Sequence, residues 1–498
     1  MELPVVSRRG FLTGLAVAPV VYAAGCSVRP SVSATNGTRP LPIPPLAPSS
    51  LGADGVRRFT LRAQAGSTEM VRGVSTPTWG YSGSVLGPTV RARRGERVEF
   101  AIGNALPEAT SVHWHGMHLP AKFDGGPHQM IAPGAVWTPN WTVRQQAATL
   151  WYHPHPHGAA EKHVHRGLSG FFLIDDDAAD ALPLPKEYGV DDIPLVIQDR
   201  RFTAGGEVDE SDPTDVGLLG DTIVTNGIAG AHLRVTTERV RLRILNGSSG
   251  RLYNLALADG RTFHLIGTDG GLLPKTVALE QLQLSPGERA EIVIALGPGE
   301  NITLRSLPIT DRAGIDRAAE FGFDDTFDIL ALQAAETLRP SPSLPTSLIP
   351  MTALAATTTQ ATRSFDLQWF MINNQRMDMN RIDMTIPVDT TEVWSVRNKD
   401  NWPHNFHVHD VQFQVLTVDG KAPPPALSGW KDTVYTSSGS TYTLAMRFAD
   451  HTDPTYPYMF HCHLLHHEDQ GMMGQFLVLA PGQRPAPMRM DMGAMGHG

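Results

Sequence analysis

One strand pattern occurs three times along this chain of 498 residues. Each copy starts with a glutamate, continues as alternating apolar and polar residues, and ends at an asparagine; the copies span residues 96–104, 238–246 and 392–398. Such alternation is typical of a strand with one buried face. A chain of this length exceeds one ordinary core, and about three domains are expected. Repeat and length together predict an all-β protein of three β-sandwich domains.

Composition suggests where these domains begin and end. An acidic run at 175–177, followed by a Pro/Ala/Leu-rich stretch, closes the first domain, and a Pro/Ser/Thr/Ala-rich stretch without periodicity separates the second from the third. The expected division is a leader and tether (1–48), a first domain (49–188), a second domain (189–337), a linker (338–364), a third domain (365–482) and a Met-rich tail (483–498).

The amino terminus predicts export. Residues 7–12 read Ser-Arg-Arg-Gly-Phe-Leu and an apolar run to Ala24 follows, which is typical of a twin-arginine signal peptide read by that export machinery. The alternative is an ordinary secretory leader that contains two arginines. The apolar run is too short to span a bilayer, so we expect a periplasmic or other extracytoplasmic protein. Cys26 after Ala-Ala-Gly is either a lipid anchor or an incidental cysteine.

Charge and cysteine content exclude some functions. The net charge of −9 offers no basic face, so nucleic acid is not an expected partner. The chain has two cysteines, Cys26 in the leader and Cys462 in a metal motif, so no structural disulfide is expected.

Histidines cluster in the two outer domains. Only His232 and His264 fall in the middle domain, whereas four His-x-His pairs occupy the others, at 113/115, 153/155, 407/409 and 461/463. Strand spacing points both imidazoles of a pair to one face. A single pair is usually a surface feature, but four pairs supply enough nitrogen ligands for three copper ions.

The segment 461–472 adds a different donor set. Cys462, His467 and Met472, with a second histidine, provide the His₂Cys site with a weak axial Met that is typical of blue copper. His404, three residues before His407, is free to be that second histidine. On a strand, His461 and His463 face away from Cys462, so they would serve another metal centre behind it.

These motifs closely resemble those of the multicopper oxidases, which include laccases, cuprous oxidases and bilirubin oxidases. The resemblance covers about residues 55–480 and rests on His-Trp-His-Gly at 113–116, Trp-Tyr-His-Pro-His at 151–155, His-x-x-His-x-His at 404–409 and His-Cys-His-x-x-x-His-x-x-x-x-Met at 461–472. It implies cupredoxin-like Greek-key sandwiches, reduction of O2 to two waters, and a middle domain that acts as a spacer.

The resemblance also implies four copper ions and their ligands. The type-1 copper takes His404, Cys462, His467 and Met472; the type-2 copper takes His113 and His407; one type-3 copper takes His115, His153 and His463, and the other His155, His409 and His461. Asp124 and Glu468 align with acids that deliver protons in the family. Asp124 could instead form a turn before Gly125, and Glu468 could be a carboxylate that only supports a ligand.

The reducing substrate is less constrained. Cuprous oxidases carry a Met-rich insertion, but residues 336–364 contain only Met351. Asp400 matches a carboxylate near their substrate copper, whereas Trp402 stands where Met is expected. We therefore expect a monomeric, laccase-like oxidase of phenols, with a cuprous oxidase for copper tolerance, another metal-ion oxidase, or a non-enzymatic exported copper-binding protein as alternatives.

Two groups of methionines have open roles. Met371, Met377, Met379 and Met384 either bind Cu(I) or fill the core. The tail residues 488–497 either capture Cu(I) through thioether and imidazole groups or form a terminus without a binding role.

Overall fold

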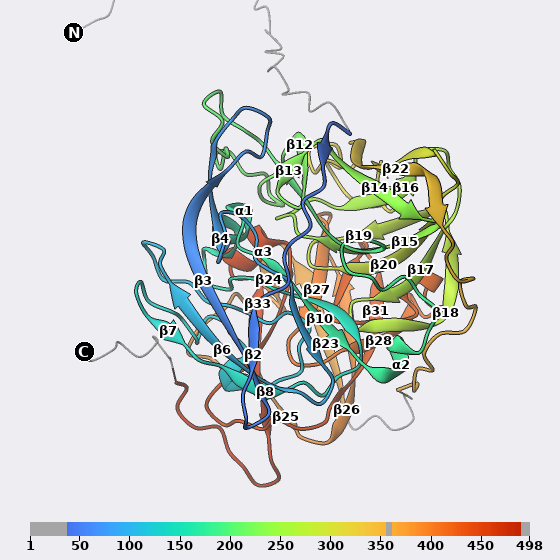
Figure 1. Ribbon diagram of the computed structural model, residues 1–498. Coiled ribbons are helices and arrows are strands. Elements are labelled where there is room, and N and C mark those ends of the chain that lie inside the picture. Colours follow the sequence, from blue (N-terminus) through green and yellow to red (C-terminus); the bar gives the residue numbers. More distant parts are fainter. Residues whose placement is uncertain (1–36, 355–360, 490–498) are drawn as a thin grey trace, which may run out of the picture. The chain divides into compact units, whose positions relative to one another are not determined.

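The strand pattern that recurs in the sequence forms one inner strand in each of three β-sandwiches. In a computed structural model, which describes residues 37–354 and 361–489, the copies are β6 (Arg97–Asn104), β15 (Arg239–Asn246) and β26 (Thr390–Asn398). Each copy pairs in parallel with an early strand of its own sandwich, namely β3 (Val56–Thr68), β11 (Asp192–Arg200) or β23 (Ala361–Gln368). Figure 1 shows the three groups in blue to cyan, green to yellow, and orange to red.

The terminal asparagine of the pattern has the same role each time. The Nδ2 atoms of Asn104, Asn246 and Asn398 donate to distant carbonyls at 2.8, 3.0 and 2.9 Å. Each Oδ1 atom accepts the backbone N–H two residues further on, which closes a turn. A side chain that is both donor and acceptor is needed at this buried strand end, because the backbone groups would otherwise lack partners.

The first sandwich is built from two sheets. One contains β2 (Ser49–Leu51), β3, β6 and β7 (Val136–Trp137), with β4 (Thr76–Tyr81) beside β3 and β8 (Asn140–Thr142) beside β6. The other contains β5 (Val90–Arg93), β10 (Gly170–Asp175) and β9 (Ala148–Tyr152). Phe100, Trp114 and Trp141 pack against one another in the core of this sandwich.

The second sandwich has the larger sheets. One contains β13 (Ile228–Ala229), β12 (Thr222–Thr225), β11, β15, β20 (Arg289–Ala295), β17 (Phe263–Thr268) and β18 (Gly271–Leu279). The other contains β1 (Arg39–Pro40), β14 (Ala231–Thr237), β22 (Phe327–Arg339), β21 (Asn301–Leu307), β16 (Tyr253–Leu257) and β19 (Gln281–Leu284).

The third sandwich shares its core with the second. One sheet contains β24 (Met371–Ile372), β23, β26, β31 (Thr441–Phe448), β28 (Phe413–Val418) and β29 (Trp430–Lys431); the other contains β25 (Met384–Pro387), β33 (Met473–Leu479), β32 (Tyr458–His461), β27 (His404–Val408) and β30 (Thr433–Thr436). Leu252 and Phe321 of the middle sandwich pack into this core with Trp394. The prediction of an all-β fold with three sandwiches is confirmed.

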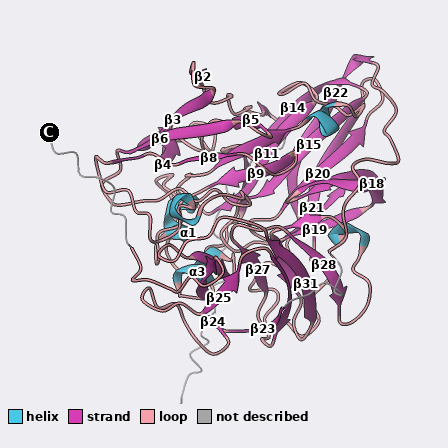
Figure 2. Ribbon diagram, turned by 90° about the horizontal axis from the view of Figure 1, so that it is seen from below, coloured by secondary structure: helices cyan, strands magenta, loops and turns pink. Residues whose placement is uncertain are grey.

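Helices are few and short among the described residues (Figure 2): α1 (Ala160–His165), α2 (Asp177–Asp180), α3 (Leu465–Asp469) and the 3-10 turns η1 (Ala121–Phe123) and η3 (Pro425–Leu427). Asp469 of α3 accepts the N–H groups of Ala160 and Glu161 at 2.8 and 2.9 Å. A carboxylate of the third sandwich thus caps a helix of the first and ties the two together. No described helix is long and apolar enough to cross a membrane.

Residues 39–48 differ from the expectation that the chain up to residue 48 lies outside the fold. Strand β1 pairs in parallel with β14 at the edge of a middle-sandwich sheet, and Leu41 is buried beside it. Tyr188 donates from its hydroxyl to the Pro44 carbonyl at 2.7 Å. The Pro-rich composition suggested a tether, but an edge strand tolerates proline because its outer N–H needs no partner. The leader and Cys26 lie outside the described residues.

The first residues of the expected linker (338–364) and of the expected tail (483–498) also contact the folded domains. Strand β22 continues to Arg339, and Leu348 is buried in the core of the middle sandwich. At the other end, Met488 Sδ accepts a weak hydrogen bond from Gln475 Nε2 at 3.6 Å, so the first part of the tail lies against β33. Residues 490–498, with the remaining tail methionines and His497, lie outside the described residues.

Candidate metal centre

Eight imidazoles meet between the first and third sandwiches. Strand β9 ends before His153, and an isolated antiparallel bridge joins His153 to His113. Strands β27 and β32 pair so that His407 faces His461. All four His-x-His pairs predicted from the sequence are brought together, and every one of their side chains is buried: His113, His115, His153, His155, His407, His409, His461 and His463.

The inward nitrogens of this cage fall into three groups. His153 Nε2 lies 3.4 Å from both His115 Nδ1 and His463 Nε2. His461 Nε2 lies 3.2 Å from both His155 Nε2 and His409 Nε2. The Nε2 atoms of His113 and His407 are buried and have no hydrogen-bond partner among the described residues.

Hydrogen bonds made by the outward nitrogens decide which nitrogen of each ring carries the proton. His409 Nδ1 donates to Asp124 Oδ2 at 2.7 Å, and His115 Nε2 donates to Asp432 Oδ1 at 2.9 Å. Backbone carbonyls accept the outer N–H groups of His113, His153 and His407 at 3.0, 2.9 and 2.8 Å. Since a neutral imidazole has one N–H, the inward nitrogens carry lone pairs.

This arrangement fits a metal cation. Burial, and then the neighbouring imidazoles, hold the pKa of His153, His407 and His409 well below the usual range, so protons cannot separate the facing lone pairs. Lone pairs about 3 Å apart in a dry interior repel one another, and a cation between them removes the repulsion. Buried nitrogen ligands of this kind suit copper.

A second cluster lies on the opposite face of the same strand end. Cys462 Sγ lies 3.7 Å from His404 Nδ1 and 3.5 Å from His467 Nδ1, and these two nitrogens are 3.0 Å apart. Their outer nitrogens donate to Asp400 Oδ2 at 3.3 Å and to the Asp215 carbonyl at 2.8 Å. The lone pairs therefore converge on the sulfur.

The thiol and Met472 complete this donor set. Burial raises the pKa of Cys462 to about 12, so a thiolate there requires a bound cation. Met472 is fully buried; its carbonyl accepts the Cys462 N–H at 3.1 Å, and its N–H donates to the His467 carbonyl at 2.9 Å. Two histidines, a thiol and an adjacent buried methionine match the soft ligand set of a blue copper site.

Asp124 and Glu468 both lie beside the cage. Asp124 binds His409 through its carboxylate and His113 through its carbonyl, while its Oδ1 atom is buried without a hydrogen bond in the described structure. Glu468 Oε1 lies 3.2 Å from His155 Nδ1, and Oε2 lies 3.4 Å from His461 Nδ1. Burial raises the pKa of Glu468 well above its usual range. Both carboxyls contact candidate ligands, so each can support a ligand as well as move a proton.

Sequence reasoning missed three buried residues that hold the donors. Asp432 contacts His115, Arg289 of the middle sandwich contacts Asp432, and Asn405 accepts the His463 N–H at 2.5 Å. Asn405 directly follows His404, so its place inside the histidine motif could have indicated a role at the site. Arg289 and Asp432 lie in no ligand motif, and only the folded chain brings them together.

A three-sandwich fold that encloses clustered imidazoles beside a buried Cys/His₂/Met set defines a class of copper-dependent oxidoreductases. Models of multicopper oxidase domains match residues 62–179 and 346–482. The chain is 36% identical over 485 residues to the cell division protein FtsP of Shigella dysenteriae, covering 95% of this chain and 98% of that one. The multicopper oxidase mco of Staphylococcus haemolyticus is 36% identical over 460 residues, covering 90% and 95%.

Solved structures agree with this likeness. A bacterial laccase-like multi-copper oxidase from Ochrobactrum superposes with a TM-score of 0.80 at 35% identity, covering 88% of this chain and all of that chain. The chain therefore belongs to the multicopper oxidase family. The prediction of cupredoxin-like sandwiches and of a copper-dependent oxidoreductase is confirmed at this level.

We expect copper removal to destabilise the protein, because the facing lone pairs lose their cation. Ligand present at about 100 times its dissociation constant adds about 2.7 kcal/mol of stability. Thermal unfolding of the copper-loaded and chelator-treated protein measures the difference, and added copper should restore the higher midpoint. Equal midpoints in the two states would contradict the cation site.

Proposed function

We propose that the chain is a laccase-like oxidase that couples four one-electron oxidations of phenols to the reduction of O2 to two waters. The single observation that carries this proposal is the complete set of twelve buried donor side chains in two adjoining clusters. A protein that had lost oxidase activity would have no reason to keep eight mutually repelling imidazoles in its interior.

We infer four copper ions from the grouping of the donors. The first inward group suits one type-3 copper, held by His115, His153 and His463; the second suits its partner, held by His155, His409 and His461. His113 and His407 remain for the type-2 copper, and His404, Cys462, His467 and Met472 for the type-1 copper. Copper supplies one-electron redox chemistry at a potential that the thiolate and axial Met adjust.

The residues between the two clusters support electron transfer. Cys462 is bonded through the backbone to His461 and His463, one from each type-3 group, so a short covalent route leads from the sulfur into the cage. Asn405 stabilises this route, since its Oδ1 atom accepts the His463 N–H and lies 3.6 Å from the Cys462 sulfur.

The surroundings of His467 favour an aromatic reductant. The ring of Phe370 lies 5.3 Å from the His467 ring, and Trp402 lies 6.2 Å from it, measured between ring centroids. Both aromatic side chains are half-buried, so each presents part of its ring to solvent. Such partly exposed rings offer a phenol a stacking surface beside the imidazole that would receive its electron.

The same surroundings disfavour a metal-ion reductant. Asp400 is 4% exposed and is already engaged by His404 and by the Trp369 N–H, so its carboxylate is not free to hold Cu(I). Met371, Met377 and Met379 are half-buried, which suits packing as well as ligation. A cuprous oxidase is therefore the second choice.

Relatives named cell division protein FtsP match this chain as well as those named multicopper oxidase. Similarity alone does not choose between an oxidase and a protein with a role in cell division. The intact donor set favours the oxidase. Only an oxidase would consume dioxygen, so O2 uptake separates the two functions.

We expect copper-loaded protein to consume O2 faster with a methoxyphenol than with Cu(I), Fe(II) or bilirubin. Phe370→Ala should raise KM for the phenol about 2- to 10-fold, because an aromatic contact contributes about 1 kcal/mol. Turnover of Fe(II) should not change. Phe202→Ala, at a half-buried phenylalanine of the middle sandwich, is the matched control. No O2 uptake with any of these reductants would contradict the oxidase assignment.

We also propose that Asp124 and Glu468 deliver protons to the cage. Asp124→Asn should slow O2 reduction about 100- to 10,000-fold, the usual contribution of a positioned proton donor, while the blue colour and copper content persist. Stopped-flow reoxidation of reduced protein by O2 measures the effect, with Glu468→Gln compared in parallel. Loss of copper from Asp124→Asn would instead assign Asp124 a holding role.

We propose export through the twin-arginine pathway to an extracytoplasmic location. Replacing Arg8 and Arg9 together with lysine should leave the protein in the cytoplasm, because that pathway requires the arginine pair. An ordinary secretory leader tolerates the change, so unaltered export would refute the assignment. Cys26→Ser separates the remaining alternatives: it should move the protein from the membrane to the soluble fraction only if Cys26 carries a lipid.

A further inference from the structure

A turn of the middle sandwich, residues 285–288, contacts Asn405 and the cage histidine His463. Ser285 Oγ and the Pro286 carbonyl accept the Nδ2 protons of Asn405 at 3.0 and 2.8 Å. Gly287 has φ +83°, and a Cβ atom there would lie 2.9 Å from His463 Nδ1, so only glycine fits so close to the ring. The middle sandwich therefore does more than separate its neighbours.

Arg289, the first residue of β20 directly after this turn, binds Asp432 through two hydrogen bonds. Its Nη1 atom lies 2.7 Å from Asp432 Oδ1, and its Nη2 atom lies 2.6 Å from Asp432 Oδ2. Both side chains are completely buried. The Nε atom donates to the Thr149 carbonyl at 3.0 Å, so the guanidinium plane is fixed on both sides.

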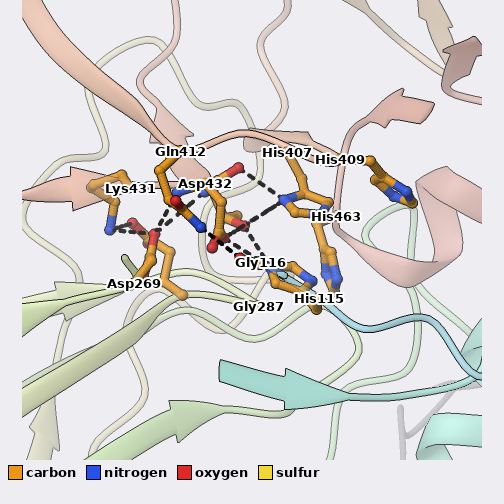
Figure 3. Close-up of polar contacts among 12 residues, drawn as sticks. His115, Gly116, Asp269, Gly287, His407, His409, Gln412, Lys431, Asp432 and His463 are labelled. Atoms are coloured by element: carbon orange, nitrogen blue, oxygen red, sulfur yellow. Dashed lines mark hydrogen bonds and ion pairs between the residues drawn. The ribbon is translucent and has the colours of Figure 1, made fainter. Parts of the chain in front are cut away.

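Asp432 in turn accepts hydrogen bonds from imidazoles of two different groups. Its carboxylate accepts from His115 Nε2, and its carbonyl accepts from His407 Nδ1 at 2.8 Å. Thr433 Oγ1 lies 3.1 Å from each of the same two nitrogens. Figure 3 shows Asp432 between Lys431 on one side and the rings of His115 and His407 on the other.

A second ion pair holds the backbone beneath Asp432. Asp269 accepts the N–H of Arg289 at 2.8 Å and that of Asp432 at 3.2 Å, and Lys431 Nζ lies 3.1 Å from Asp269 and 2.9 Å from Glu288. Burial alone would lower the pKa of Lys431, but the two carboxylates outweigh it and raise the pKa to about 12. Lys431 thus ties Asp269 and Glu288 of the middle sandwich to the strand that carries Asp432.

The backbone at Gly116 packs closely against the Arg289–Asp432 ion pair. Gly116, directly after His115, has φ +81°, and a Cβ atom there would lie 2.5 Å from Asp432 Oδ2 and 2.8 Å from Arg289 Nη2. The backbone next to one candidate ligand thus approaches the ion pair as closely as a residue without a side chain allows.

We propose that Arg289 is a positioning residue of the copper cage: through Asp432 it fixes the rings of His115 and His407, so that the middle sandwich sets the geometry of the type-2 copper and of one type-3 copper. This inference rests on the proposed function. Arginine suits the task because its planar fork holds a carboxylate in one orientation, which lysine cannot do. A buried carboxylate behind an imidazole also raises its basicity as a ligand.

The test compares Arg289→Met with wild type after copper loading. Electron paramagnetic resonance separates type-1 from type-2 Cu(II), and the proposal predicts that the type-2 signal weakens relative to the type-1 signal. Affinity for the type-2 copper should fall about 10- to 100-fold, as measured by copper titration. The blue absorption should stay, because His404, Cys462 and His467 have no contact with Arg289.

Arg243→Met is the matched control. Arg243 is also buried, binds Asp192 through two hydrogen bonds and donates to Thr149 Oγ1 and Glu291, and none of these three residues has a hydrogen bond or ion pair with a cage histidine. Arg289→Lys, which keeps the charge but loses the fork, serves as a second variant if Arg289→Met does not fold, and it should weaken the type-2 signal to a smaller extent.

The outcomes separate the two proposals. A wild-type ratio of type-2 to type-1 signal in both Arg289 variants overturns the positioning role, as does an equal loss in Arg243→Met, which would indicate general destabilisation. Failure of the wild-type protein to bind copper at all would instead overturn the proposed function.

Discussion

The outer nitrogens of six of the eight cage imidazoles donate to backbone carbonyls and carboxylates, and most of the site follows from this constraint. Once His115 donates to Asp432 and His409 to Asp124, their other nitrogens must turn lone pairs inward. Eight such rings are stable in a dry interior only around cations. The fold therefore has to supply acceptors behind the rings, and these acceptors come from the first and third sandwiches.

Each of the three sandwiches contributes different residues to the site. The first and third supply the imidazoles from strand ends, where two residues of a strand point to one face. The third also supplies Cys462, which shares a strand end with two cage histidines. The middle sandwich supplies none of the proposed ligands, but its 285–288 turn contacts Asn405 and His463, and Arg289 directly after the turn binds Asp432. Arg289 of this sandwich pairs with Asp432 across the domain boundary, and through Asp432 it orients two rings.

Much of this could be predicted from the sequence, because the information was local. His-x-His spacing and the Cys462 segment needed only the period of a strand, and the repeated Glu-to-Asn pattern predicted a strand with one buried face. That each asparagine closes a turn is visible only in the structure. The error at residues 39–48 arose because proline content argues for a tether, whereas an edge strand accepts proline. Arg289 and Asp432 are 143 residues apart and lie in no motif, so their pairing depends on packing that sequence patterns do not encode.

The most direct test of the account is copper-edge anomalous diffraction from crystals of the copper-loaded protein. The account predicts four peaks, three among the eight imidazoles and one between Cys462, His404 and His467. It further predicts that the peak nearest His113 and His407 loses occupancy in Arg289→Met crystals while the peak at Cys462 does not. A loaded protein with no copper at Cys462, or with fewer than three ions in the cage, would contradict it.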